Sequence, residues 1–225
     1  MPEIVVQGEN VRFQDSVKAS PRTVLFLHGA GGSHHTFRDQ WAGLKGKARL
    51  VIPDLPGHGE SGGTPRDTVA AYSSWVAAFA EETGVTRFVL AGHSLGGAIA
   101  LQAALDGVKG IEALVLLGTG GRLKISPVLF EGIAGRFREF APELVEWMMS
   151  AESSPLLRED VTTDVLSTRP ATFPATKMGT GSPSADRPIR RSAGSTVPPL
   201  HLPEEADDLP RDAQGGGRRG RSGGA

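Results

Sequence analysis

Three serines lie in the pattern Gly-x-Ser-x-Gly, which can present a hydroxyl nucleophile: Ser61, Ser94 and Ser222. Short motifs of this kind also arise by chance, so the surrounding sequence must distinguish them. Ser61 lies in a loop rich in Pro and Gly, and Ser222 lies in a C-terminal stretch rich in Gly and Arg. Only Ser94 follows an apolar run, residues 87–91, and precedes an Ala-rich run, residues 95–105.

The glycines around Ser94 have a physical purpose at a strand-to-helix turn. A serine there adopts a strained backbone conformation, and side chains two residues to either side would collide. The turn exposes the hydroxyl, and the start of the following helix offers unpaired N–H groups to developing negative charge. Ser94 is therefore the predicted catalytic nucleophile.

A second glycine-rich segment, His28 to Gly32, follows the apolar run at residues 23–27. We expect this loop to direct a backbone N–H, that of Ala30, at an oxyanion. The second donor of such an oxyanion hole is the N–H of Leu95, directly after the nucleophile. His28 itself is predicted to be a structural hydrogen-bonding residue and not a base.

Two nucleotide-binding interpretations of the glycines fail on spacing. A dinucleotide fingerprint that starts at Gly29 needs glycine at position 34, where the sequence has His34. A phosphate-binding loop around Lys47 needs Ser or Thr at position 48 and Gly at position 41, which are Ala48 and Trp41. No cofactor is therefore expected.

The other titratable residues suggest weaker sites. Asp54 and His58 could form an acid–base pair, but both precede Ser94 in a loop rich in Pro and Gly, which favours a role in bracing that loop. His34 and His35 are neighbours and should point apart on a helix. Since no carboxylate follows at ligand spacing, we predict no metal site.

The elements that must position these residues alternate between strands and helices. Parallel strands buried on both faces read as continuous apolar runs, and this spacing predicts an α/β fold with a mostly parallel sheet covered on both sides. The expected strands are an opening hairpin at 4–6 and 11–13, then 23–27, 49–52, 87–91 and 111–117. The expected helices run from Ser33 toward Trp41, from Asp67 or Thr68 to Gly84, and from Leu95 to Leu105.

After residue 121 the pattern changes to helices without intervening strands. One apolar face joins Val128, Leu129, Ile133, Phe137 and Phe140, and a second joins Leu144, Val145, Met148 and Met149, with both methionines expected in a core. We predict three parts: a core at residues 1–121, a helical cap at 122–170, and a low-complexity, disordered tail at 171–225.

Composition excludes several classes of protein. The net charge is -1 and there are no cysteines, so nothing favours nucleic acid, an anionic membrane or a disulfide framework. The three arginines near the C-terminus come without aromatic residues, which favours a solvated coil over an RNA-binding segment. No secretory signal and no run of about 20 apolar residues is present, so we expect a cytoplasmic protein.

Residues 1 to about 170 resemble the α/β-hydrolase superfamily. The resemblance rests on His28-Gly29, on Asp54-x-Pro56-Gly57-x-Gly59-x-Ser61 and on Gly92-His93-Ser94-Leu95-Gly96-Gly97, each after a predicted strand. It implies an α/β-hydrolase fold, Ser94 as nucleophile, and Ala30 and Leu95 as the oxyanion hole. It also implies a helical cap that shapes the pocket for a small-molecule substrate, and it is closest to small-molecule esterases and ring-cleavage hydrolases.

The sequence departs from this family after the fourth parallel strand. Family members continue with an acid and then a histidine. Here residues 118–121 are Gly-Thr-Gly-Gly, and the single histidine after Ser94 is His201, between prolines, with Asp186 as its possible acid. We expect that the segment from about Ala171 is not the family's own C-terminal sequence, as after a frameshift, and that the sheet is incomplete and its edge exposed.

Two functions follow from these expectations. The first is a serine hydrolase that attacks ester-like or activated carbonyl bonds of a small molecule through Ser94. The alternative is a catalytically inactive, truncated hydrolase that lacks the triad acid and histidine. No oligomeric state follows from the sequence.

Overall fold

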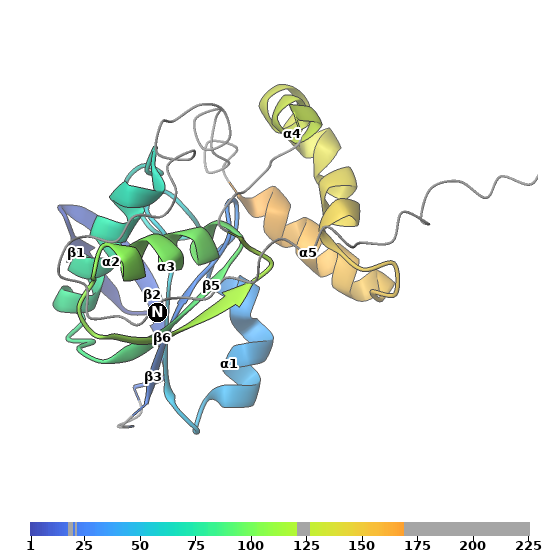
Figure 1. Ribbon diagram of the computed structural model, residues 1–225. Coiled ribbons are helices and arrows are strands. Elements are labelled where there is room, and N and C mark those ends of the chain that lie inside the picture. Colours follow the sequence, from blue (N-terminus) through green and yellow to red (C-terminus); the bar gives the residue numbers. More distant parts are fainter. Residues whose placement is uncertain (18–19, 21, 121–126, 169–225) are drawn as a thin grey trace, which may run out of the picture. The chain divides into compact units, whose positions relative to one another are not determined.

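The computed structural model describes residues 1–17, 20, 22–120 and 127–168, and Figure 1 shows their helices and strands. Each strand and helix predicted before residue 121 forms, with ends that differ slightly from those expected. The strands are β1 (Glu3–Val6), β2 (Glu9–Asp15), β3 (Thr23–Leu27), β4 (Arg49–Pro53), β5 (Phe88–His93) and β6 (Ile111–Leu117). The helices are η1 (His34–Phe37), α1 (Arg38–Leu44), α2 (Val69–Glu82), α3 (Leu95–Leu105), α4 (Pro127–Met148) and α5 (Pro155–Ser167).

The strands form one six-stranded sheet in the order β1-β2-β4-β3-β5-β6. The hairpin of β1 and β2 is antiparallel and joins β4 antiparallel, whereas β4, β3, β5 and β6 are mutually parallel. The predicted mostly parallel sheet is thus confirmed. Because the parallel strands end at the same edge, the loops after β3, β4 and β5 meet there.

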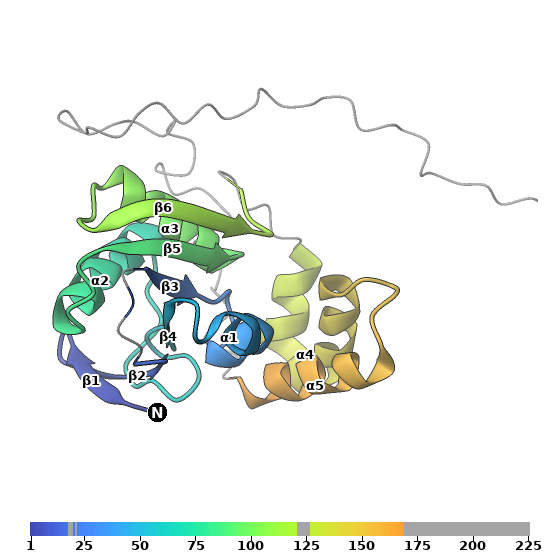
Figure 2. The same cartoon turned by 90° about the horizontal axis from the view of Figure 1, so that it is seen from below.

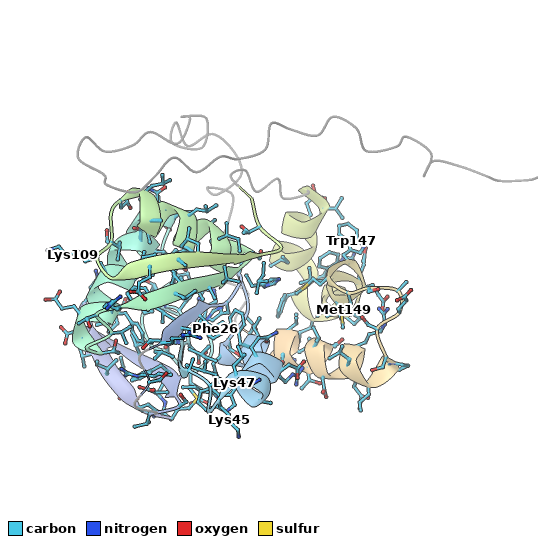
Figure 3. The ribbon with its side chains drawn as sticks, turned by 60° about the horizontal axis from the view of Figure 1, so that its bottom comes forward. Phe26, Lys45, Lys47, Lys109, Trp147 and Met149 are labelled. Atoms are coloured by element: carbon cyan, nitrogen blue, oxygen red, sulfur yellow. The ribbon has the colours of Figure 1, made fainter. Side chains whose placement is uncertain are left out.

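Helices cover both faces of the central strands. Successive side chains of β3 point to opposite faces. Leu25 and Leu27 pack in the core beneath α2 and α3, and Phe26, labelled in Figure 3, packs on the other face with Phe37. The Phe26 and Phe37 ring centroids are 4.8 Å apart. Figure 2 accordingly shows α1 and α3 on opposite sides of the sheet.

Two helices begin at predicted capping residues. The hydroxyl of Ser33 accepts the N–H of His35 at 3.2 Å at the start of η1. The hydroxyl of Thr68, and not the carboxylate of Asp67, caps α2 by accepting the N–H of Ala71 at 3.1 Å. Each cap satisfies one of the N–H groups that a helix leaves without an internal acceptor.

The prediction that residues 111–117 form a buried strand was wrong about burial. The strand forms, but it lies at the sheet edge and, within the described residues, pairs with β5 alone. The exposed fractions of Val115, Leu116 and Leu117 are 42%, 39% and 38%. An apolar run therefore identified the strand correctly, while its burial depends on neighbours that the described residues do not supply.

Helices α4 and α5 pack against each other around their own apolar cluster. The cluster is formed by Phe137, Phe140, Ala141, Leu144, Val145 and Val165. Ile133 and Met149 are partly buried against it, as predicted, but Val128 lies 48% exposed and Met148 lies 53% exposed. The prediction of core positions for Val128 and Met148 was wrong, because the apolar cluster that α4 forms with α5 does not include these two side chains.

The boundaries of the predicted parts remain predictions. The junction at residues 121–126 and the tail at 171–225 lie outside the described residues. Within the described residues, none of the helices combines the length and apolar character needed to cross a membrane.

Candidate active site

Ser94 lies at a sharp corner between β5 and α3. Its backbone has φ 52° and ψ -117°, a conformation that residues with a Cβ rarely adopt. Its N–H donates to the carbonyl of Leu117 at 2.9 Å, and its own carbonyl accepts the N–H groups of Gly97 at 3.0 Å and Ala98 at 3.2 Å. These bonds hold the strained corner, and the Ser94 residue is only half-buried.

The flanking glycines are required by close backbone contacts. A Cβ added at Gly92 would overlap the carbonyl group of Gly96, and a Cβ at Gly96 would overlap the carbonyl oxygen of Leu27. Helix α3 therefore approaches β3 and β5 more closely than any side chain at these positions allows. These contacts agree with the predicted steric role of the motif glycines.

The loop after β3 contacts the Ser94 corner. A Cβ at Gly29 would lie 3.2 Å from the Cβ of Ser94 and 3.2 Å from Nδ1 of His93. The carbonyl oxygen of Gly29 accepts hydrogen bonds from the His28 ring at 2.8 Å and from the N–H of Gly32 at 3.1 Å. Because the oxygen and hydrogen of a trans peptide point in opposite directions, these bonds direct the N–H of Ala30 away from the His28 ring.

His28 is a structural residue of this loop. It is fully buried, and its Nε2 accepts the N–H of Leu55 at 2.9 Å, so the ring proton resides on Nδ1 and is donated to Gly29. Burial, together with the neighbouring His58, lowers the pKa of His28 to about 3. A ring that stays neutral and has both nitrogens engaged agrees with the predicted structural role.

Asp54 connects two segments at the same sheet edge, the turn at His34 and the loop at Glu60 and Ser61. Its buried carboxylate accepts the N–H of His34 at 2.6 Å, lies 2.9 Å from Nδ1 of His34, and accepts the N–H of Glu60 at 2.8 Å. Its carbonyl oxygen accepts the hydroxyl of Ser61 at 2.8 Å. Burial raises the pKa of Asp54, but the hydrogen bonds from His34 and Glu60 outweigh this, and the pKa lies below its ordinary value.

The position of His34 corrects one expectation, that the side chains of His34 and His35 point apart. His34 and His35 do not point apart, because their ring centroids lie 4.1 Å apart. The geometry of a 3-10 turn and the Asp54 carboxylate together place the His34 ring. Asp54 and His34 meet because β3 and β4 are adjacent parallel strands, an adjacency that the residue pattern alone does not state. Within the described ranges, no three potential ligands gather to hold a metal ion.

Two predicted partners of Ser94, Ala30 and Leu95, lie among the described residues, and the other two do not. The loop of Ala30, the N–H of Leu95 at the start of α3, and Ser94 come together at one corner. His201 and Asp186 lie outside the described residues. Within the part of the chain that the structure describes, no side chain forms a hydrogen bond with the Ser94 hydroxyl.

Comparisons with known proteins agree with this geometry. A family model described as alpha/beta hydrolase fold matches residues 22–191. Among solved structures, a thermophilic esterase from Thermogutta terrifontis, solved with malate bound, superposes with a TM-score of 0.65 at 26% sequence identity. The match covers 84% of this chain and 73% of the esterase.

Two curated relatives are similar over shorter stretches. The magnesium-chelatase 30 kDa subunit of Rhodobacter capsulatus is 38% identical over 128 residues, which cover 53% of this chain and 44% of that protein. The 2-succinyl-6-hydroxy-2,4-cyclohexadiene-1-carboxylate synthase of Salmonella typhimurium is 38% identical over 96 residues, which cover 43% of this chain and 38% of that enzyme. The chain thus spans less than half the length of both relatives.

Proposed function

Since the chain belongs to the alpha/beta hydrolase fold family, we propose that it is a serine hydrolase in which Ser94 attacks an ester-like or activated carbonyl of a small molecule. The observation that carries this proposal is the strained Ser94 corner, with φ 52°, at the start of α3. Backbone strain of this kind costs roughly 1–3 kcal/mol and persists at sites where it serves a function. The esterase among the similar structures supports the ester-like class of substrate.

In the proposed reaction, the Ser94 oxygen forms a bond to the carbonyl carbon and its proton passes to a general base. The electron pair of the C=O bond moves to the oxygen, which the N–H groups of Ala30 and Leu95 stabilise. Leu95 begins α3, so its N–H has no acceptor within the helix. Collapse then breaks the bond to the leaving alcohol, which takes up the proton, and water hydrolyses the acyl-serine by the same steps.

The general base is the part of the proposal that decides between two functions. Nδ1 of His28 is bonded to Gly29 and Nδ1 of His34 is bonded to Asp54, and neither ring forms a hydrogen bond with Ser94. His201, with Asp186, is the candidate for an active enzyme. If no imidazole reaches Ser94, the chain is an inactive hydrolase that binds small molecules without turning them over.

Labelling with a fluorophosphonate probe, together with hydrolysis of p-nitrophenyl acetate, separates these functions. An active enzyme is labelled at Ser94 and releases p-nitrophenol, and Ser94→Ala loses both signals, the rate falling by a factor of about 10³ or more. Ser222→Ala is the matched control, because Ser222 lies in the same Gly-x-Ser-x-Gly pattern, and it should retain both.

Each remaining outcome has a distinct meaning. Labelling at Ser94 without turnover supports the inactive alternative. Turnover that survives in Ser94→Ala contradicts the proposed nucleophile. The absence of both labelling and turnover in the folded protein also supports the inactive alternative, because a serine without a general base reacts poorly with the probe. Loss of turnover in His201→Ala with labelling retained at a slower rate identifies the general base.

A further inference from the structure

A cavity of about 310 Å³ opens between α4 and α5. It is lined by Arg136, Phe137, Arg138, Glu139, Leu166 and Thr168. Its volume lies at the lower end of the range for small-molecule sites. The apolar wall comes from Phe137 and Leu166, while two arginines and one glutamate give the lining a net charge of +1.

The cavity forms where α4 is broken. Arg136 has φ -149° and ψ 47°, so two helical segments meet there and the chain turns out of the regular helix path. The Arg136 guanidinium lies 5.5 Å from the centre of the Phe140 ring, which restrains it, and only 3.7 Å separates it from the carboxylate of Glu143. A separation of 3.7 Å is longer than a charge-assisted hydrogen bond, so the pair with Glu143 is weak and the guanidinium can bind a second anion.

Arg138 is the second available cation. Among the described residues, it forms no ion pair and no hydrogen bond through its side chain. Arginine presents a planar set of N–H donors that matches a carboxylate in two-point contact. A single net positive charge and an apolar wall suit a monoanionic carboxylate on a short carbon chain better than a dianionic phosphate.

Direct contacts connect this cavity to the Ser94 corner. Thr168, which lines the cavity, donates its hydroxyl to the carbonyl of Gly31 at 2.5 Å. Gly31 follows Ala30, and Gly29 in the same loop contacts Ser94. Arg38 also pairs with two carboxylates of α5, Asp160 at 3.5 Å and Asp164 at 3.7 Å, which holds α5 near this loop.

We infer that Arg136 and Arg138 bind the free carboxylate of an ester-containing acid and so orient its distal ester bond toward Ser94. This inference rests on the proposed function and narrows it to substrates with one carboxylate and one hydrolysable carbonyl. Glu139 opposes anion binding and limits its strength, and the apolar wall contacts the carbon chain between the two groups.

The test compares monomethyl esters of succinate, glutarate and adipate with the corresponding uncharged dimethyl esters. Binding is measured by isothermal titration calorimetry on the Ser94→Ala protein, in which no turnover interferes. At least one monomethyl ester should bind about tenfold more tightly than its dimethyl ester. The double variant Arg136→Gln/Arg138→Gln should lose this preference, Arg138→Lys should retain part of it, and Glu139→Gln should increase it.

Arg87→Gln is the matched control, because Arg87 is an exposed arginine that pairs with Glu112 and does not line the cavity, and its preference should equal that of the parent. Circular dichroism establishes that each variant is folded. The inference would be overturned if the monomethyl and dimethyl esters bound equally, or if the preference for the monomethyl ester survived in the double variant. Binding of inorganic phosphate more tightly than any monomethyl ester would also overturn it. Since binding is measured without turnover, failure of Ser94 as nucleophile would appear separately, in the labelling experiment.

Discussion

Strands β5 and β6 are parallel neighbours with similar apolar sequences, yet their surroundings differ. β5 lies between β3 and β6 and buries Phe88 and Leu90 completely. β6 leaves Val115, Leu116 and Leu117 exposed by 38–42%. The comparison teaches that an apolar run predicts a strand, whereas burial depends on how many neighbours the strand has.

The carboxyl ends of β5 and β6 also differ in how closely they are packed. The carboxyl end of β5 carries the Ser94 corner, where backbone groups approach so closely that glycine is required at positions 92 and 96. The carboxyl end of β6 is followed by Gly118, where an added Cβ would meet, among the described residues, only the His93 ring at 3.6 Å. Substitutions at corresponding places should therefore differ in effect.

The largest difference is expected between Gly92→Ala and Gly118→Ala. A Cβ at position 92 overlaps the Gly96 carbonyl group, so we expect loss of more than about 4 kcal/mol in the free energy of unfolding, or no folded protein. Gly118 has φ 53°, and alanine there costs about 1–2 kcal/mol from the left-handed backbone alone. Urea unfolding measures both, and equal losses would show that the Ser94 corner is not closely packed.

Truncation of side chains in the two strands should give the next largest difference. Leu90→Ala opens a cavity in the core and should destabilise the fold by about 2–5 kcal/mol. Leu116→Ala removes a side chain that is already 39% exposed, and we expect less than about 1 kcal/mol. The measurement is again the urea unfolding midpoint. A large loss in Leu116→Ala would mean that a segment outside the described residues covers β6.

The buried region at the end of β3 and β5 should also be sensitive to acid. His28 has its pKa lowered to about 3 in the fold, against 6.5 in the unfolded chain, so between these values the unfolded state binds the extra proton. The contribution to stability is complete above pH 6.5 and is lost as the pH falls toward 3. We expect a loss of about 3 kcal/mol between pH 7 and pH 4.

His28→Gln provides the control for this pH dependence. Glutamine does not titrate, so the variant should be less stable at pH 7 but should lose less stability on acidification than the parent. Unfolding free energies at several pH values measure this difference. An identical pH dependence in parent and variant would assign the acid sensitivity to other groups, such as Asp54.

The smallest effect on stability is expected from a charge on β6. Leu116→Lys should change the free energy of unfolding by less than about 0.5 kcal/mol, because the side chain can extend into water. An exposed apolar edge strand favours pairing with other chains, so the same substitution should reduce concentration-dependent association. Light scattering at increasing protein concentration tests this. Unchanged scattering would indicate that β6 does not mediate association.

Local patterns predicted the elements and the Ser94 corner because their causes are local. Gly92, Ser94 and Gly96 lie within five consecutive positions, and their spacing reflects a single turn between strand and helix. The Asp54–His34 pair was missed because it joins loops that follow different strands, and only the strand order brings them together. The apolar run of β6 predicted burial because a sequence pattern does not state how many neighbours a strand has, and only the departure from the family after this strand indicated an exposed edge.

The hydrogen bond from the Ser94 N–H to the Leu117 carbonyl joins the reactive corner to the last residue of the edge strand. Fraying of β6 would release this bond and expose the Ser94 amide to solvent. The rate of deuterium uptake at that amide would therefore report how often the edge strand detaches. Detachment of the edge strand would in this way alter the backbone of the nucleophile, because the Ser94 N–H loses its acceptor.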